Sequence, residues 1–208
     1  MEPAAAFDRA ERSRGQILQA ARTEFIENGY AGASLNRIIL ASGLTKGGFY
    51  FHFPSKLALA LAVLDEEGRL WQERVAAEVA TLPNIVDRMV AVPRLIVRLA
   101  REGRGPAPLR RLADELAANP DVREEVCGSL RTWIRSAAED FREAQQTGWI
   151  GSEVDTDALA EVAIAGFIGM QTITEQFDDD EMDRRLDALD RVLTMALAPS
   201  SPPGSGKE

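Results

Sequence analysis

Residues 29–61 read GYAGASLNRIILASGLTKGGFYFHFPSKLALAL, and this stretch decides the fold. Ser34 has the side chain of a good N-cap, and Gly43 suits the left-handed residue that ends a helix, so one short helix is expected between them. Thr45 then caps a second short helix over 46–52. Two short helices joined by a tight turn form a helix-turn-helix.

Aromatic residues fill the second of these short helices. Leu44 precedes its cap and Phe49 is its fourth residue, which is the spacing of a hydrophobic staple. Phe49, Phe51 and Phe53 are expected in the core of this region. Tyr50 falls between them and should point elsewhere.

Outside this stretch the pattern is helical nearly throughout, and we find no convincing alternating strand. We expect further helices at 12–28, 55–80, 84–102, 108–118, 121–147, 156–176 and 180–197. Pro93 should kink or divide its helix. The sequence therefore predicts an all-α protein: an N-terminal three-helix head with the helix-turn-helix (1–54), a helical body (55–198) and a disordered tail (199–208).

Charge is unevenly distributed along the 208 residues. The net charge is −9, yet residues 1–56 hold seven Lys and Arg against five Asp and Glu. Lys46 and Lys56 fall in the first turns of expected helices, where a cation opposes the helix dipole. A docked phosphate would explain that placement. Close approach of DNA to the backbone would likewise explain Gly47 and Gly48, which weaken a short helix.

Other protein classes find little support in the residues. The charged N-terminus is not a secretory signal, and no apolar run is long enough to span a membrane, so we expect a cytoplasmic protein with no membrane contact. With one histidine and one cysteine, no metal-ligand or nucleophile motif is present, and we expect no enzyme, cofactor or metal. The acidic run 178–181 is interpreted as a solvated turn that opens a helix.

The segment TKGGFYFHFPSK, residues 45–56, closely resembles the DNA-binding head of the TetR family, and the match covers roughly 12–62. The resemblance implies a homodimer that binds double-stranded operator DNA and senses a small molecule. Capping and solvation are the alternative roles of the polar residues, and a structural role is the alternative for the histidine. The expected DNA contacts are Ser34, Arg37, Thr45, Lys46, Gly47, Gly48, Tyr50, His52 and Lys56.

The middle helices should enclose a pocket for a small apolar ligand, with ordinary core packing as the alternative. Trp133 offers a broad apolar wall, and Gln171 could orient a carbonyl or hydroxyl. The candidate lining residues are Met89, Val92, Leu95, Leu99, Leu130, Trp133, Phe167, Met170 and Gln171.

The last two helices are the expected dimer interface, with intramolecular packing as the alternative. The preceding helix carries a small-residue face at Ala165, Gly166 and Gly169. The final helix carries a stripe at three-four spacing, Met182, Leu186, Leu189, Leu193 and Ala196. A twofold dimer reads two half-sites, so the operator should be roughly palindromic.

A narrower resemblance suggests the ligand. TKGGFYFHFPSKLALALAVL is similar to the head of the autoregulator receptors, the branch that senses γ-butyrolactones, and Trp133 matches the pocket tryptophan of that branch in context. The resemblance implies repression released by a γ-butyrolactone, furan or butenolide. The alternative is a TetR-type repressor of an efflux or catabolic operon that senses another hydrophobic compound.

Overall fold

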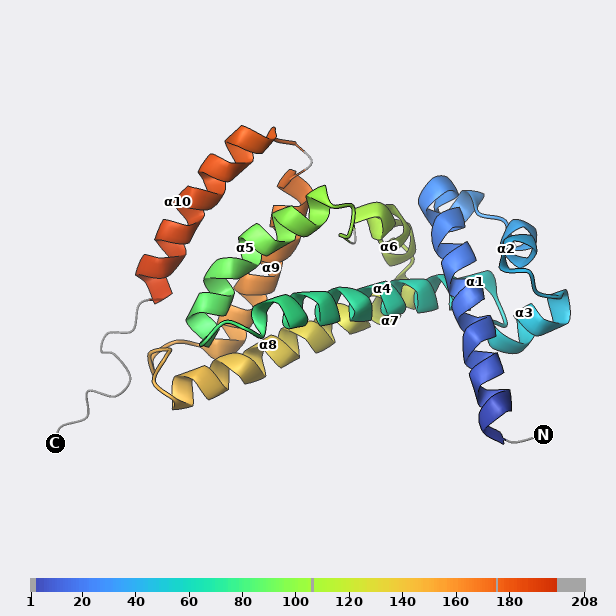
Figure 1. The fold of residues 1–208 in the computed structure, drawn as a ribbon, viewed down its shortest axis with the longest axis horizontal. Helices are drawn as coiled ribbons and strands as arrows, with labels where there is room; N and C mark the ends of the chain where they lie inside the picture. The colour runs from blue at the N-terminus through green and yellow to red at the C-terminus, as the bar shows by residue number, and fades with distance from the viewer. Residues whose placement is uncertain (1–2, 106, 175, 198–208) are drawn as a thin grey trace. The chain divides into compact units, whose positions relative to one another are not determined.

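The computed structural model describes residues 3–105, 107–174 and 176–197, and all of the regular structure in these ranges is helical (Figure 1). The helices are α1 (Pro3–Gly32), α2 (Leu35–Ser42), α3 (Lys46–His52), α4 (Lys56–Val79), α5 (Ile85–Arg101), the 3-10 turn η1 (Ala107–Leu109), α6 (Arg110–Ala117), α7 (Pro120–Val126), α8 (Gly128–Gln146), α9 (Thr156–Thr174) and α10 (Asp179–Leu197). The all-α prediction is confirmed, and the expected tail at 199–208 lies outside the described residues.

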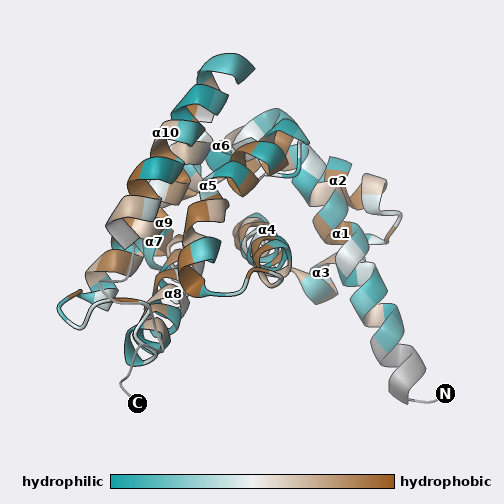
Figure 2. Ribbon diagram, turned by 60° about the vertical axis from the view of Figure 1, so that its left-hand side comes forward, coloured by the Kyte–Doolittle hydropathy of each residue, from teal (hydrophilic) through white to brown (hydrophobic). Residues whose placement is uncertain are grey.

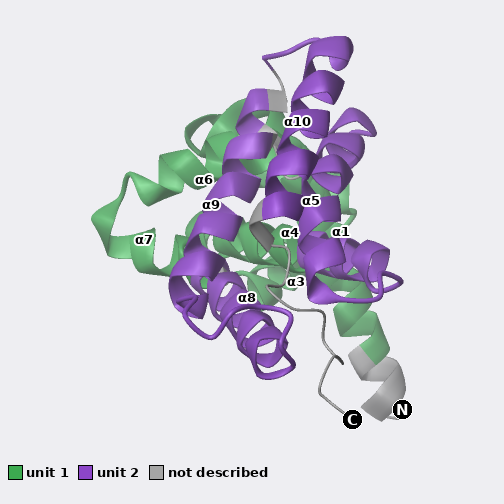
Figure 3. Cartoon of the chain, turned by 90° about the vertical axis from the view of Figure 1, so that its left-hand side faces the viewer, with its two compact units in different colours: residues 1–69, 108–129 green, residues 70–107, 130–208 purple. Residues whose placement is uncertain are grey.

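The chain forms two compact units (Figure 3). Unit 1 comprises residues 1–69 and 108–129, and unit 2 comprises residues 70–107 and 130–208. The first division falls inside α4, between Arg69 and Leu70, and the later ones fall inside η1 and in the first turn of α8. Helix α4 therefore supplies long stretches of residues to both units.

Unit 1 has a single apolar core. Helix α1 packs against α2 and α6, which places α6 beside the N-terminal helices despite its distance in sequence. Residues from α1, α2, α3, α4 and α6 are buried in this core, among them Ile17, Phe25, Ile38, Phe49, Leu59 and Leu112. Burying such side chains stabilises the unit by about 1.5–3 kcal/mol each.

Helix α1 breaks at Gly29, where φ is 65° and ψ is −176°, a conformation open essentially only to glycine. The Glu115 carboxylate of α6 accepts hydrogen bonds from the freed amides of Tyr30 (2.7 Å) and Ala31 (3.1 Å). Arg111 holds the same carboxylate at 2.8 Å. The Ala31 amide, together with Arg111 and the Tyr30 amide, keeps the pKa of Glu115 below its usual value despite desolvation. The break in α1 is therefore the point where α6 is fastened to the head.

In unit 2, α5 packs against both α9 and α10. Arg94 of α5 pairs with Asp187 and with Asp190 (2.6 Å) of α10, and Arg101 pairs with Asp179 at 2.8 Å. Exposed ion pairs of this kind contribute about 0–1 kcal/mol each to the free energy of folding, so they orient the two helices more than they stabilise the contact. Figure 2 shows that α10 carries hydrophilic and hydrophobic residues along its length.

Met182 and Leu186 of α10 provide the apolar part of this contact. They are 1% and 2% exposed and pack with Val97 of α5. The expectation that they belong to a dimer interface is therefore wrong, and their alternative role, intramolecular packing, is what the structure has.

The structure also tests three further predictions about the helices. Helix α5 continues through Pro93 instead of dividing there. The helix expected over 121–147 is wrong, because Cys127 separates α7 from α8. The acidic run does open a helix, and Asp178 accepts a hydrogen bond from the Glu181 amide at 2.8 Å.

By length and composition, no single described helix could cross a bilayer. The bent pair α3 and α4 passes the same test only when the two are taken together, which is weak evidence, since buried core helices also pass it.

Replacing Gly29 with alanine tests the break in α1. A Cβ at this position would lie 2.5 Å from Glu115 Oε1, in a backbone conformation that alanine rarely adopts. We expect Gly29→Ala to lower the free energy of unfolding in urea by about 2 kcal/mol or more.

The matched control is Gly15→Ala in the same helix, where a Cβ meets nothing within 4 Å. It should raise stability by roughly 0.5–1 kcal/mol. Equal effects of the two changes would contradict the role given to Gly29.

Candidate functional site

The helix-turn-helix of α2 and α3 has the caps that the sequence predicts. Ser34 is extended and its side chain accepts from the Arg37 amide. Gly43 ends α2 in the left-handed conformation, with φ of 71°. Thr45 is extended and its hydroxyl accepts from the Gly48 amide at 3.2 Å. The turn geometry and both helix starts are confirmed.

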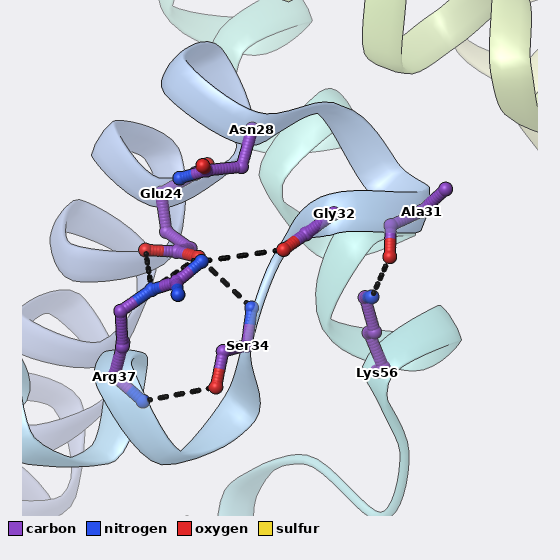
Figure 4. Close-up of polar contacts among 7 residues, drawn as sticks. All are labelled: Glu24, Asn28, Ala31, Gly32, Ser34, Arg37 and Lys56. Atoms are coloured by element: carbon purple, nitrogen blue, oxygen red, sulfur yellow. Dashed lines mark hydrogen bonds and ion pairs between the residues drawn. The ribbon is translucent and has the colours of Figure 1, made fainter.

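A buried carboxylate fixes α2 against α1 (Figure 4). Glu24 of α1 accepts from the Ser34 amide at 2.9 Å and from Arg37 Nε at 3.0 Å through each of its oxygens. Arg37 Nη2 also donates to the Gly32 carbonyl at 3.2 Å. These bonds tie the first turn of α2 to the preceding helix and so set the angle of the helix-turn-helix.

Glu24 is a functional residue that the sequence analysis missed. Hydrogen bonding from Arg37 keeps the pKa of Glu24 below its usual value, helped by the Ser34 amide and opposed by desolvation. The side chain is 9% exposed, whereas Arg37 is 57% exposed. Nothing in the sequence of an amphipathic helix distinguishes this glutamate from solvated ones such as Glu27.

The aromatic residues of α3 divide between two faces. Phe49 and Phe53 are 0% and 4% exposed, as expected, but Phe51 is 79% exposed. The expectation for Phe51 is wrong because it follows alternate residues, whereas a helix places residues four apart on one face. Tyr50 points away from the core, as expected, and is 50% exposed.

The first turn of α3 has little side-chain bulk, because two of its residues are glycines. Lys46 and Gly47 are exposed and Gly48 is half-buried. A Cβ at Gly47 would meet nothing within 4 Å, and one at Gly48 would lie 3.4 Å from Thr45 Oγ1. Packing within the chain therefore does not require glycine at Gly47, which leaves room for an outside surface to approach the backbone.

The side chains of Lys56 and His52 make contacts within the chain. Lys56 Nζ donates to the Ala31 carbonyl at 3.3 Å and lies 4.9 Å from the centre of the Tyr30 ring. His52 is half-buried and its ring contacts Phe51 edge to face. The nine predicted DNA contacts thus all lie on or beside α2, α3 and the start of α4.

Six of the nine predicted ligand residues come together in unit 2. They surround Trp71 of α4, which the sequence analysis did not single out. The ring of Phe167 lies 4.4 Å from that of Trp133 and 5.5 Å from that of Trp71, both edge to face. The six residues are Val92, Leu95, Leu99, Trp133, Phe167 and Met170.

The remaining three lie elsewhere. Met89 packs with a separate cluster around Phe141, and Leu130 is half-buried at the start of α8. The side chain of Gln171 lies outside the described residues.

A surface groove of about 670 Å³ runs between α4, α5 and α10. Val79 and Leu95 line it and also belong to the cluster around Trp71, so the groove and the cluster share a wall. The groove is also lined by the charged residues Arg94, Arg98 and Asp183. Arg98 forms an ion pair with Glu78 at 2.7 Å. The volume of the groove is in the range of small-molecule sites. No group of three or more described acidic, histidine or cysteine side chains could hold a metal ion.

Comparisons with known proteins agree with this geometry. The family model described as "Bacterial regulatory proteins, tetR family" matches residues 17–63. The transcriptional regulator AcuR of Cereibacter sphaeroides is 30% identical over 77% of this chain and 75% of its own. The regulator UidR of Escherichia coli is 35% identical over 71% and 74%. A solved TetR transcriptional regulator from Chloroflexus aurantiacus superposes with a TM-score of 0.70 at 29% identity, covering 90% of this chain and 95% of that one.

The A-factor receptor protein of Streptomyces griseus is a more distant relative. It is 27% identical over 80% of this chain and 56% of its own. This likeness is consistent with the autoregulator branch without distinguishing it from the rest of the family.

Glutamine at Glu24 tests the network between α1 and α2. A carboxylate with a lowered pKa stabilises the fold above its ordinary value of 4.5, and the contribution is lost as pH falls below that value. Glu24→Gln should therefore cost about 1–3 kcal/mol of unfolding free energy at pH 7, with the gap to wild type narrowing below about pH 4.5.

Urea unfolding at several pH values measures this gap. Glu11→Gln, an exposed change on the same helix, is the control and should stay within about 0.5 kcal/mol of wild type. A gap that is the same at pH 7 and at pH 4 would overturn the charged role of Glu24.

Proposed function

Because the chain belongs to the TetR family of bacterial regulatory proteins, whose members are DNA-binding transcription regulators and not enzymes, we propose that it is a ligand-responsive repressor. It binds a roughly palindromic operator as a homodimer and leaves it when a small, largely apolar molecule binds. The observation that carries the proposal is the capped helix-turn-helix, which holds an exposed α3 against a buried core.

Residues 1–54 bind DNA in this proposal. Helix α3 enters the major groove with Lys46, Gly47, Gly48 and Tyr50 leading, since a recognition helix presents its first residues to base edges. Ser34, Arg37, Thr45, His52 and Lys56 contact phosphates, which fix register rather than select sequence. Thr45 and Ser34 serve as caps and contacts together. Binding to chromosomal DNA assigns the protein to the cytoplasm.

Residues 55–198 bind the ligand and form the dimer. Val162 and Ile168 of α9 are 69% and 41% exposed, and Val192 and Met195 of α10 are 61% and 81% exposed. The small residues Ala165, Gly166 and Gly169 are exposed on α9 as well. Such apolar exposure on two helices suits contact with a partner protein. If the partner is a second copy of the same chain, the dimer has two recognition helices, one for each half-site of the operator.

Helix α4 couples the two functions. Leu59 and Val63 are buried in the core of unit 1, and Trp71 is buried in the cluster of unit 2. A ligand that favours one packing of that cluster shifts α4 and moves the heads out of register with the operator. DNA and ligand then weaken each other's binding by the same factor.

The proposed ligand is of the γ-butyrolactone, furan or butenolide type. The sequence of the head and the context of Trp133 support it, together with the distant likeness to the A-factor receptor. The alternative is control of an efflux or catabolic operon by another hydrophobic compound. It is favoured by the higher identities to UidR and AcuR, whose names do not mention such a signal.

Removing single cations tests the DNA interface. Lys56→Ala should weaken binding to all sequences and lower the slope of log affinity against log salt by about one unit, because one phosphate contact is lost. Fluorescence anisotropy with DNA from upstream of the protein's own gene measures the slope. Arg135→Ala, an exposed change on α8, should leave it unchanged. An unchanged slope in the Lys56→Ala protein would refute the assignment of Lys56 to a phosphate.

Charge introduced on α9 and α10 tests the dimer. Val162→Glu combined with Val192→Glu places desolvated carboxylates in the proposed interface, so sedimentation equilibrium should show a monomer that binds the operator weakly. Ser136→Glu on the exposed side of α8 is the control and should stay dimeric. A dimer that survives the double change would move the interface elsewhere.

A further inference from the structure

The indole of Trp71 is a buried hydrogen-bond donor without a partner. The residue is 3% exposed, and its Nε1–H meets no acceptor among the described residues. Buried indole N–H groups usually find a partner, because a donor removed from water otherwise loses a hydrogen bond. This group calls for an acceptor from outside the chain.

The surroundings of Trp71 restrict that acceptor. Its neighbours in the cluster are aliphatic, aromatic or thioether side chains, including Leu95, Ile96, Leu99 and Phe167. A carboxylate placed among these apolar side chains would lose its hydration at high cost. A ligand hydroxyl would bring a donor of its own, which an indole cannot accept.

We infer that Trp71 Nε1–H donates a hydrogen bond to the carbonyl oxygen of an uncharged, largely apolar ligand and so selects lactones, esters and ketones over the corresponding acids and alcohols. The inference rests on the proposed function and deepens it, because Trp71 lies in the same cluster as Trp133 and Phe167. The surface groove shares Val79 and Leu95 with this cluster, although Trp71 itself does not line it.

The position of Trp71 connects recognition to regulation. It lies on α4 at the start of the part that belongs to unit 2, only two residues beyond the division at Arg69 and Leu70. A hydrogen bond formed here acts directly on the helix that continues into the DNA-binding unit.

The test uses the three tryptophans of the full-length chain, whose indole N–H signals are resolved by ¹⁵N–¹H correlation spectroscopy. Trp71→Phe identifies the Trp71 signal by its loss, and Trp133→Phe with Trp149→Phe identifies it by elimination if the first variant does not fold. γ-Decalactone is the probe, with decanoate and 1-decanol as matched acid and alcohol.

The lactone should move the Trp71 signal downfield, while decanoate and 1-decanol leave it in place. By calorimetric titration, Trp71→Phe should bind the lactone roughly three- to tenfold more weakly, as expected for one neutral hydrogen bond. Trp149→Phe, in the separate cluster around Phe141, should bind it as wild type does.

A Trp71 signal that the lactone does not move, that the acid and alcohol move equally, or that is already downfield without ligand overturns the inference. Wild-type affinity in Trp71→Phe does the same. Operator binding by the same protein samples is measured in parallel: its absence in wild type counts against the proposed function, whereas its presence without any indole shift counts only against the role of Trp71.

Discussion

Burial of helix α4 in two separate apolar cores links the two units along the chain. The first half of α4 buries Leu59 and Val63 in the core of unit 1, and its second half buries Trp71 in the core of unit 2. In the proposed function, this helix passes the ligand signal to the DNA-binding unit, and close-packed interiors respond to a displacement by switching between arrangements rather than by deforming smoothly.

Local chemistry made the head predictable. Helix α2 begins after Ser34 and ends at Gly43, and α3 begins after Thr45. The structure has each of these three residues in its predicted capping role. Most residues of the cluster around Trp71 were also predictable in outline, because apolar residues at helical spacing indicate a buried face. In both cases the information lies within a few residues of the feature it specifies.

Features that depend on distant partners were not predictable. Glu24 binds the Ser34 amide and Glu115 binds the Tyr30 amide, and only the fold brings these groups together, so the sequence alone does not show these contacts. The last helix has a clear apolar face, but the periodicity of its sequence does not show whether α5 or a second subunit covers that face. In the structure, Met182 packs within the chain. Phe51 shows a different limit: its alternation with two buried phenylalanines is a strand pattern, and helical geometry turns it outward.

In the proposed function, one chain couples operator binding to an apolar signal. DNase footprinting on DNA from immediately upstream of the protein's own gene, with and without a panel of γ-butyrolactones, furans and butenolides, tests it most directly. We predict protection of an inverted repeat whose half-sites lie about one helical turn or a multiple of it apart, removed by at least one member of the panel. Protection that no small apolar compound removes, on that DNA or on operators selected from the whole genome, would contradict the account.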